Sequence, residues 1–117
     1  MKVYIAGPMR GHPELNFPAF HKAQRKLEKC GFEVYNPADP ELPQDKPLSY
    51  YMRIHLPQLC GCDALYLLKG WQNSEGAQDE YLVGLWCGIY AFESLTKLKA
   101  YREEVTCRDE NQGPNEG

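Results

Sequence analysis

The segment from Gly70 to Glu80 most constrains what this chain can fold into, because two different periodicities meet there. An apolar run over residues 64–68 precedes it and predicts a buried strand, and a helical pattern follows it. Ser74 stands at the expected start of that helix. In an open α/β sheet, ligands bind at the carboxyl ends of the strands. Glu80 is therefore predicted to lie where a carboxylate can meet a small molecule.

Strand patterns alternate with helical patterns along the whole chain. We expect strands over residues 2–6, 32–35, 63–68 and 88–92, and helices over residues 17–30, 48–59, 75–87 and from 94 to about 105. Such an alternation favours a parallel sheet with right-handed crossovers. The predicted fold class is α/β, with a doubly wound, mostly parallel sheet in a flavodoxin-like or Rossmann-like three-layer sandwich. Residues 1–107 are expected to form a single domain, and residues 108–117 a flexible polar tail.

Several residues indicate where these elements begin, end or are interrupted. Asn16 is the expected N-cap of the first helix and Gly31 its C-cap, whereas Pro57 is expected to kink or shorten the second helix. Residues 37–47 contain four prolines and show no periodicity, which predicts a long surface loop and a candidate flap over a site.

Composition excludes some classes of function. The net charge is −3 and no basic block occurs, which argues against duplex nucleic acid as a partner. A single nucleotide remains possible, because one arginine and a helix N-terminus can hold its phosphate. No run reaches the length of a membrane span, and the first residues resemble a strand more than a signal peptide. We expect a cytoplasmic protein with no membrane partner.

The five cysteines are odd in number and irregularly spaced. This pattern favours reduced, mostly buried thiols over a metal site. The histidines at positions 12, 21 and 55 give no ligand spacing either. After the first strand the sequence reads GPMRG and lacks the dinucleotide fingerprint, so NAD bound in the usual manner is not expected. We therefore predict no cofactor and no metal.

Two loops, over residues 7–13 and 69–76, follow predicted strands, and they meet if the first and third strands are neighbours. The first loop brings Arg10, and the second brings Ser74 with the N-terminus of the following helix. Together these groups form an anion-binding set. Glu80, one turn deeper, could act as a nucleophile or base on whatever carries the anion.

Each member of this set also has a plainer interpretation. Arg10 could be a solvated loop residue, Tyr4 a core residue and Ser74 only a helix cap. Glu80 could face solvent, although Ala77 and Tyr81 place it near the predicted buried stripe.

Five motifs carry a resemblance to a known family: residues 4–11 (YIAGPMRG), 16–20 (NFPAF), 36–38 (NPA), 62–64 (CDA) and 70–80 (GWQNSEGAQDE). Over about residues 2–92 the chain resembles a family of short bacterial and phage proteins in the nucleoside 2-deoxyribosyltransferase superfamily. That superfamily includes deoxyribosyltransferases and deoxynucleoside 5′-monophosphate N-glycosidases. The resemblance implies a doubly wound fold, a homodimer or higher homo-oligomer, and a nucleotide or nucleoside substrate.

The resemblance also implies roles for individual residues. Glu80 matches the catalytic glutamate that attacks the anomeric carbon of the sugar, and Ser74 matches the serine that holds the 5′-phosphate in the monophosphate hydrolases. Tyr4 and Arg10 match the tyrosine and arginine of the hydrolases' first loop. The expected substrate contacts are completed by Gly7, Gly76 and Ala77.

His55 is the main departure from the superfamily, which has an aspartate there that helps to protonate the leaving base. A histidine can serve as a general acid, so His55 is the provisional second catalytic residue. It is equally compatible with an altered or lost activity, or with an exposed helix residue. The expected function is an N-glycosidic-bond hydrolase or deoxyribosyltransferase acting on a (deoxy)nucleoside 5′-monophosphate. The alternative is a non-catalytic nucleotide-binding or sensor protein on the same fold.

Overall fold

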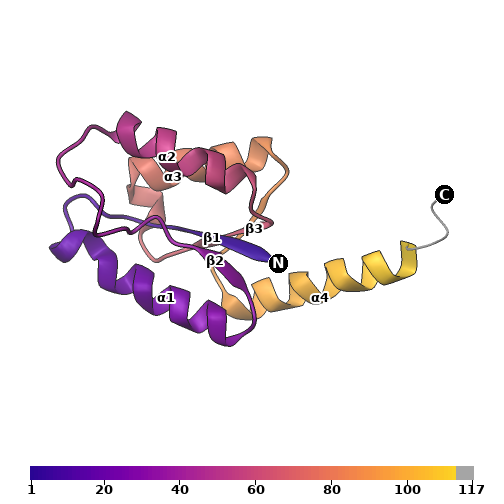
Figure 1. The fold of residues 1–117 in the computed structure, drawn as a ribbon. Coiled ribbons are helices and arrows are strands. Elements are labelled where there is room, and N and C mark those ends of the chain that lie inside the picture. Colours follow the sequence, from indigo (N-terminus) through magenta and orange to yellow (C-terminus); the bar gives the residue numbers. More distant parts are fainter. Residues whose placement is uncertain (113–117) are drawn as a thin grey trace.

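Four short segments form a parallel sheet in the computed structural model, which describes residues 1–112 (Figure 1). The strands are β1 (Lys2–Ala6), β2 (Glu33–Tyr35), β3 (Ala64–Leu67) and β4 (Tyr90–Phe92), in the spatial order β2-β1-β3-β4. Every neighbouring pair is parallel. The predicted doubly wound α/β class is confirmed, and β1 and β3 are neighbours, as the convergence of the two loops requires.

Four helices flank the sheet: α1 (Phe17–Lys29), α2 (Leu48–Cys60), α3 (Glu75–Trp86) and α4 (Leu95–Gln112). Figure 1 shows α2 and α3 on one face and α1 and α4 on the other. Two short 3₁₀ turns, η1 (Pro13–Asn16) and η2 (Trp71–Asn73), precede α1 and α3. No helix in this described part of the chain is long and apolar enough to cross a membrane.

Alternation along β1 divides the core into two layers. Val3 and Ile5 pack with α1 and with Leu98 of α4, whereas Tyr4 and Ala6 face the layer that contains residues of α2 and α3. The division follows from the pleat of a strand, which sends successive side chains to opposite faces. Tyr4 therefore points toward the same layer as α3, the helix that carries Glu80.

Two glycines allow backbone arrangements that a residue with a side chain would disfavour. Gly31 has φ +89° and follows the last turn of α1, where the N–H of Phe32 donates to the Leu27 carbonyl at 3.1 Å. Cys30 therefore occupies the C-cap position, and Gly31, one residue later than its predicted role as the cap, is the left-handed glycine that ends the helix. At Gly84, an added Cβ would lie 2.7 Å from Cδ1 of Leu65, so the missing side chain lets α3 lie directly against β3.

The entrance to α1 differs from the prediction. Asn16 occupies the N-cap position, but its side chain makes no cap hydrogen bond and instead donates to the Pro8 carbonyl at 2.9 Å. Glu14, Leu15 and Asn16 all have left-handed backbone angles, with φ of 54°, 53° and 60°. Such angles are unfavourable for residues other than glycine. The amide of Asn16 is therefore used to secure a strained turn rather than to cap the helix.

Two helices are longer than predicted. α2 continues through Pro57 to Cys60, and α4 continues past residue 105 to Gln112. An Arg108–Glu104 ion pair spans one turn of α4, and Gly113-Pro114 is the first helix-breaking pair beyond it in the sequence. Residues 108–112 of the predicted flexible tail are thus helical, and residues 113–117 lie outside the described residues.

The prediction of mostly buried thiols is wrong. Cys62 is buried and Cys30 is half-buried, but Cys60, Cys87 and Cys107 are exposed. Their positions explain this, because Cys60 ends α2, Cys87 follows α3, and Cys107 lies on the polar second half of α4.

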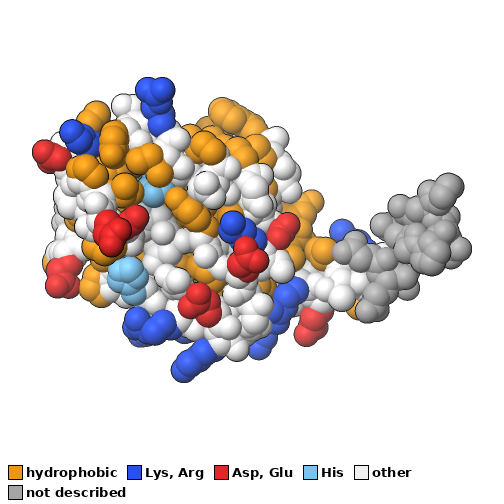
Figure 2. All heavy atoms as spheres, in the orientation of Figure 1, with side chains coloured by type: hydrophobic (Ala, Val, Ile, Leu, Met, Phe, Trp, Pro, Cys, Tyr) orange, Lys and Arg blue, Asp and Glu red, His pale blue; other side chains and the backbone are white. Residues whose placement is uncertain are grey.

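Charged side chains of both signs are interspersed on the face shown in Figure 2.

Candidate active site

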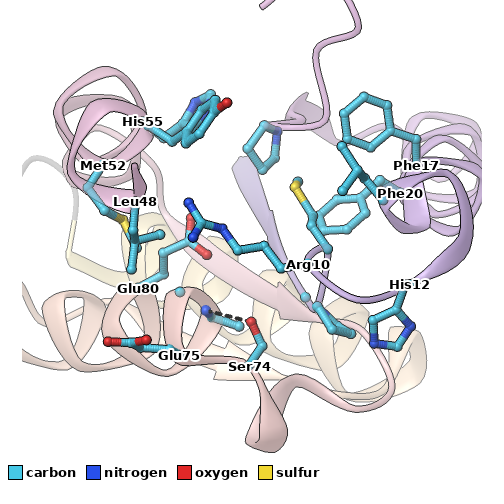
Figure 3. A pocket seen from close by; sticks show the side chains of 18 of the residues that line it. Arg10, His12, Phe17, Phe20, Leu48, Met52, His55, Ser74, Glu75 and Glu80 are labelled. Carbon is cyan, nitrogen blue, oxygen red and sulfur yellow. Dashed lines mark hydrogen bonds between the residues drawn. The ribbon is translucent and has the colours of Figure 1, made fainter. Parts of the chain in front are cut away.

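The site lies where the chain reverses its direction of winding. From β1 the chain crosses to β2 on one side, and from β3 it crosses to β4 on the other, so the loops after β1 and β3 border a crevice between them. A pocket of about 210 Å³ occupies this crevice (Figure 3). Its wall includes seven of the sequence-predicted residues: Gly7, Arg10, His55, Ser74, Gly76, Ala77 and Glu80.

Glu80 is the buried carboxyl group of this pocket. Its residue is 8% exposed, and the Tyr4 hydroxyl donates a hydrogen bond to Oε2. Burial raises the pKa of Glu80 to about 8, against the opposing effect of the Tyr4 hydrogen bond. Glu80 is therefore mostly protonated at neutral pH and becomes a carboxylate as the pH rises through about 8.

Tyr4 lies behind Glu80 rather than in the pocket wall. It is inaccessible to solvent, and burial, followed by the charge of Glu80, raises its pKa well above the ordinary value. Its ring stacks on that of Tyr35, with centroids 5.4 Å apart, because the two residues are register partners in β1 and β2. The contact of Tyr4 with Glu80 orients the carboxyl group toward the pocket.

His55 is buried on α2 and faces the same pocket. Its residue is 7% exposed, so it is not the exposed helix histidine that the sequence also allowed. A hydrogen bond of 2.8 Å joins its Nδ1 to the Tyr35 hydroxyl. Burial lowers the pKa of His55, and the nearby charge of Asp39 opposes this effect. His55 is consequently a neutral imidazole near pH 7, held by Tyr35.

The N-terminus of α3 forms the floor of the pocket next to Ser74. Ser74 Oγ accepts a hydrogen bond from the N–H of Ala77 at 3.2 Å, so Ser74 is the helix cap (Figure 3). Its own O–H remains a donor. The N–H groups of Glu75 and Gly76 have no partner among the described residues and belong to the positive end of the helix dipole.

Arg10 is exposed, and Figure 3 shows its side chain extending from the loop after β1 into the pocket. Nη2 donates to the Lys46 carbonyl at 3.2 Å, which ties Arg10 to the proline-rich loop. Gly7 lines the same loop, and an added Cβ there would lie 2.7 Å from Cβ of Leu68. The glycine thus permits the close approach of the two loops that form the crevice.

The sequence predicted the loop over residues 37–47 as a candidate flap, but it did not identify Tyr35 of β2 or the individual residues of that loop that line the pocket. Tyr35 holds His55, and Asp39 and Leu42 line the pocket from the loop over residues 37–47. Two signals could have found them: the register of Tyr4 with Tyr35, and the position of this loop at the carboxyl end of β2. The loop therefore forms part of the wall of the site.

In a comparison with protein-family models, the chain matches a domain of unknown function (DUF4406) over residues 1–91. The matched range contains all four strands except the last residue of β4, together with every residue assigned above to the pocket. The chain therefore belongs to the DUF4406 family. No curated protein matches it.

Proposed function

We propose that this member of the DUF4406 family cleaves the N-glycosidic bond of a (deoxy)nucleoside 5′-monophosphate, by hydrolysis or by transfer of the sugar to another base. The observation that carries the proposal is one pocket that combines a buried carboxyl group, Glu80, with an anion-binding helix N-terminus at Ser74. The motif resemblance to the nucleoside 2-deoxyribosyltransferase superfamily supports the same assignment.

The phosphate would bind at the N-terminus of α3. The Ser74 hydroxyl and the N–H groups of Glu75 and Gly76 would donate to its oxygens, and Arg10 would exchange its contact with the Lys46 carbonyl for the phosphate. Because Glu80 is mostly protonated near neutral pH, it does not add a full negative charge against the phosphate. The pocket would thus accept a dianion before the reaction begins.

Glu80 would then act as the nucleophile. An ionised Oε oxygen attacks C1′, the C1′–N bond breaks, and the base leaves with the bonding electron pair and takes up a proton. Water, or a second base, attacks C1′ in the next step and releases the Glu80 carboxylate. Tyr4 holds the carboxyl group in position and donates a hydrogen bond to the oxygen that does not react.

His55 would contact the leaving base. When the Tyr35 hydroxyl donates to Nδ1, the imidazole carries its proton on Nε2. Because burial lowers the pKa of His55, this neutral Nε2–H is a hydrogen-bond donor to the base rather than a strong acid. A histidine in this environment favours a base that leaves readily once it is hydrogen-bonded.

The proposal includes a homodimer. Leu82, Leu85 and Trp86 of α3 are 44%, 48% and 76% exposed. Ile89, which follows α3 in the chain, is buried in the core instead. Large apolar side chains gathered on one helix are typical of a surface that another protein covers.

Arg10→Ala tests the phosphate assignment. Loss of a charge-assisted hydrogen bond is expected to lower kcat/KM for a deoxynucleoside monophosphate by about 10–100-fold, with a much smaller effect on the corresponding nucleoside. Release of free base, followed by chromatography, measures both. Arg53→Ala, at an exposed position of α2 outside the pocket wall, is the matched control. Equal losses for nucleotide and nucleoside would contradict the assignment.

A second candidate function is nucleotide binding without turnover. The observation that favours it is the raised pKa of Glu80, because a protonated carboxyl group is not a nucleophile at neutral pH. Thermal unfolding of the wild type distinguishes the two functions. Stabilisation by monophosphates with no base release up to about pH 9, above the pKa of Glu80, would favour the binding protein.

A further inference from the structure

Two exposed thiols lie together at the end of the molecule opposite the pocket. Cys60 is the last residue of α2 and Cys87 follows the last residue of α3. Both helices begin beside the pocket and run back along the sheet, so they end near the amino ends of β1 and β3, where Met1 and Asp63 border the same hollow. This place is separate from the candidate active site.

The geometry of the pair suits a covalent bond. The two Sγ atoms are 3.8 Å apart, and a disulfide requires about 2.05 Å. A glycine follows each cysteine, and an added Cβ at Gly88 would meet no atom within 4 Å. Rotation of the two exposed side chains, with small adjustments of these glycine-containing turns, can close the remaining gap.

The other cysteines are placed differently. Cys62 is buried, its thiol donates to the Gln58 carbonyl at 3.3 Å, and burial raises its pKa to about 11. Cys30 is half-buried, and Cys107 is exposed on α4. Within the described residues, Cys60 and Cys87 are the two thiols that contact each other.

We propose that Cys60 and Cys87 form a redox-active dithiol, which hydrogen peroxide oxidises to an intramolecular disulfide between the ends of α2 and α3. One thiolate attacks a peroxide oxygen, which breaks the O–O bond and gives a sulfenic acid and, after protonation, water. The second thiolate then attacks the sulfenic sulfur, forms the S–S bond and expels a second water. Two thiols thus lose two electrons and two protons, and one peroxide becomes two waters.

The hydrogen bond to Cys60 raises the pKa of the Cys87 thiol. The two thiols share one hydrogen bond in which either sulfur can be the donor, so either can supply the attacking thiolate while the other resolves the sulfenic acid.

The disulfide would join two helices whose other ends carry pocket residues. Met52 and His55 lie on α2, and Ser74 caps the N-terminus of α3. The bond would close a loop between residues 27 positions apart and restrict the unfolded chain. The oxidised protein is expected to unfold about 10 °C higher than the reduced protein. The inference does not depend on the proposed function, because neither step uses the pocket.

The test treats the full chain with one equivalent of hydrogen peroxide and then alkylates the remaining thiols. Cys107→Ser is the reference, because it removes the separate exposed thiol and keeps the pair. It is expected to lose two hydrogen atoms by intact mass, to give a cross-linked peptide containing Cys60 and Cys87, and to gain thermal stability that dithiothreitol reverses.

Two double variants serve as controls, with Cys107→Ser combined with Cys60→Ser or Cys87→Ser. Both substitutions are at exposed positions, and both variants are expected to give no cross-linked peptide and no gain in unfolding temperature. The proposal is overturned if Cys107→Ser gains oxygen without losing hydrogen, or if the cross-linked peptide joins a different pair.

Discussion

Glu80→Gln is expected to lower the release of free base from an accepted deoxynucleoside monophosphate by about 10³-fold or more, because an amide cannot form the glycosyl intermediate. The amide oxygen can still accept the hydrogen bond from Tyr4, so the side chain keeps its position. Nucleotide binding, measured by calorimetry, should persist in the variant. Loss of turnover with retained binding separates a chemical role from a structural one.

The pH dependence of the wild type belongs to the same prediction. Because burial raises the pKa of Glu80 to about 8, kcat/KM should increase as the pH rises through about 8 and then level off. Glu33→Gln, the same change at an exposed residue of β2, is the matched control and should behave as the wild type. Turnover in Glu80→Gln within a few-fold of the wild type would refute the nucleophile assignment.

The stability of the protein should also depend on pH through Glu80, whatever its function. The folded-state pKa is about 8, whereas an unfolded glutamate titrates near 4.3. Between these values the folded protein holds a proton that the unfolded chain releases, so the free energy of unfolding falls as the pH rises. The stabilising contribution is complete below about pH 4 and is lost progressively up to about pH 8.

Glu80→Gln isolates this contribution, because glutamine has no proton to lose. Relative to the wild type, the variant should gain about 3–5 kcal/mol of unfolding free energy between about pH 5 and about pH 9. Urea denaturation under reducing conditions measures the difference at each pH. Parallel curves for the two proteins over this range would show that the folded-state pKa of Glu80 is not raised.

Much of the fold could be predicted because its signals are local. The apolar run before Gly70, the capping Ser74 and the helical spacing up to Trp86 predict β3, the turn and α3 within one or two residues. The alternation of such units implies a parallel sheet. Local signals do not show which distant residues a side chain will contact. The hydrogen bond from the Asn16 amide to the Pro8 carbonyl, made instead of a cap on α1, could therefore not be predicted.

The candidate site could be predicted in part. The carboxyl ends of β1 and β3 meet, so Arg10, Ser74 and Glu80 were expected together, and the structure places all three around one pocket. The pleat and register of the strands decide whether a neighbour of Glu80 lies behind its carboxyl group or in the pocket wall. Tyr4 consequently lies behind the carboxyl group, and Tyr35 reaches His55 through a pairing with β1 that the sequence shows only after the strand order is known.

The most direct test of the nucleophile is to trap the sugar on the protein. A deoxynucleoside monophosphate with fluorine at C2′ in the arabino configuration destabilises the cationic transition states, so a glycosyl-enzyme should accumulate. If Glu80 is the nucleophile, one base is released per active site and the peptide that contains Glu80 gains a mass equal to the fluorinated sugar phosphate. An analogue that binds, as judged by thermal stabilisation, yet releases no base and leaves Glu80 unmodified would contradict this role of Glu80.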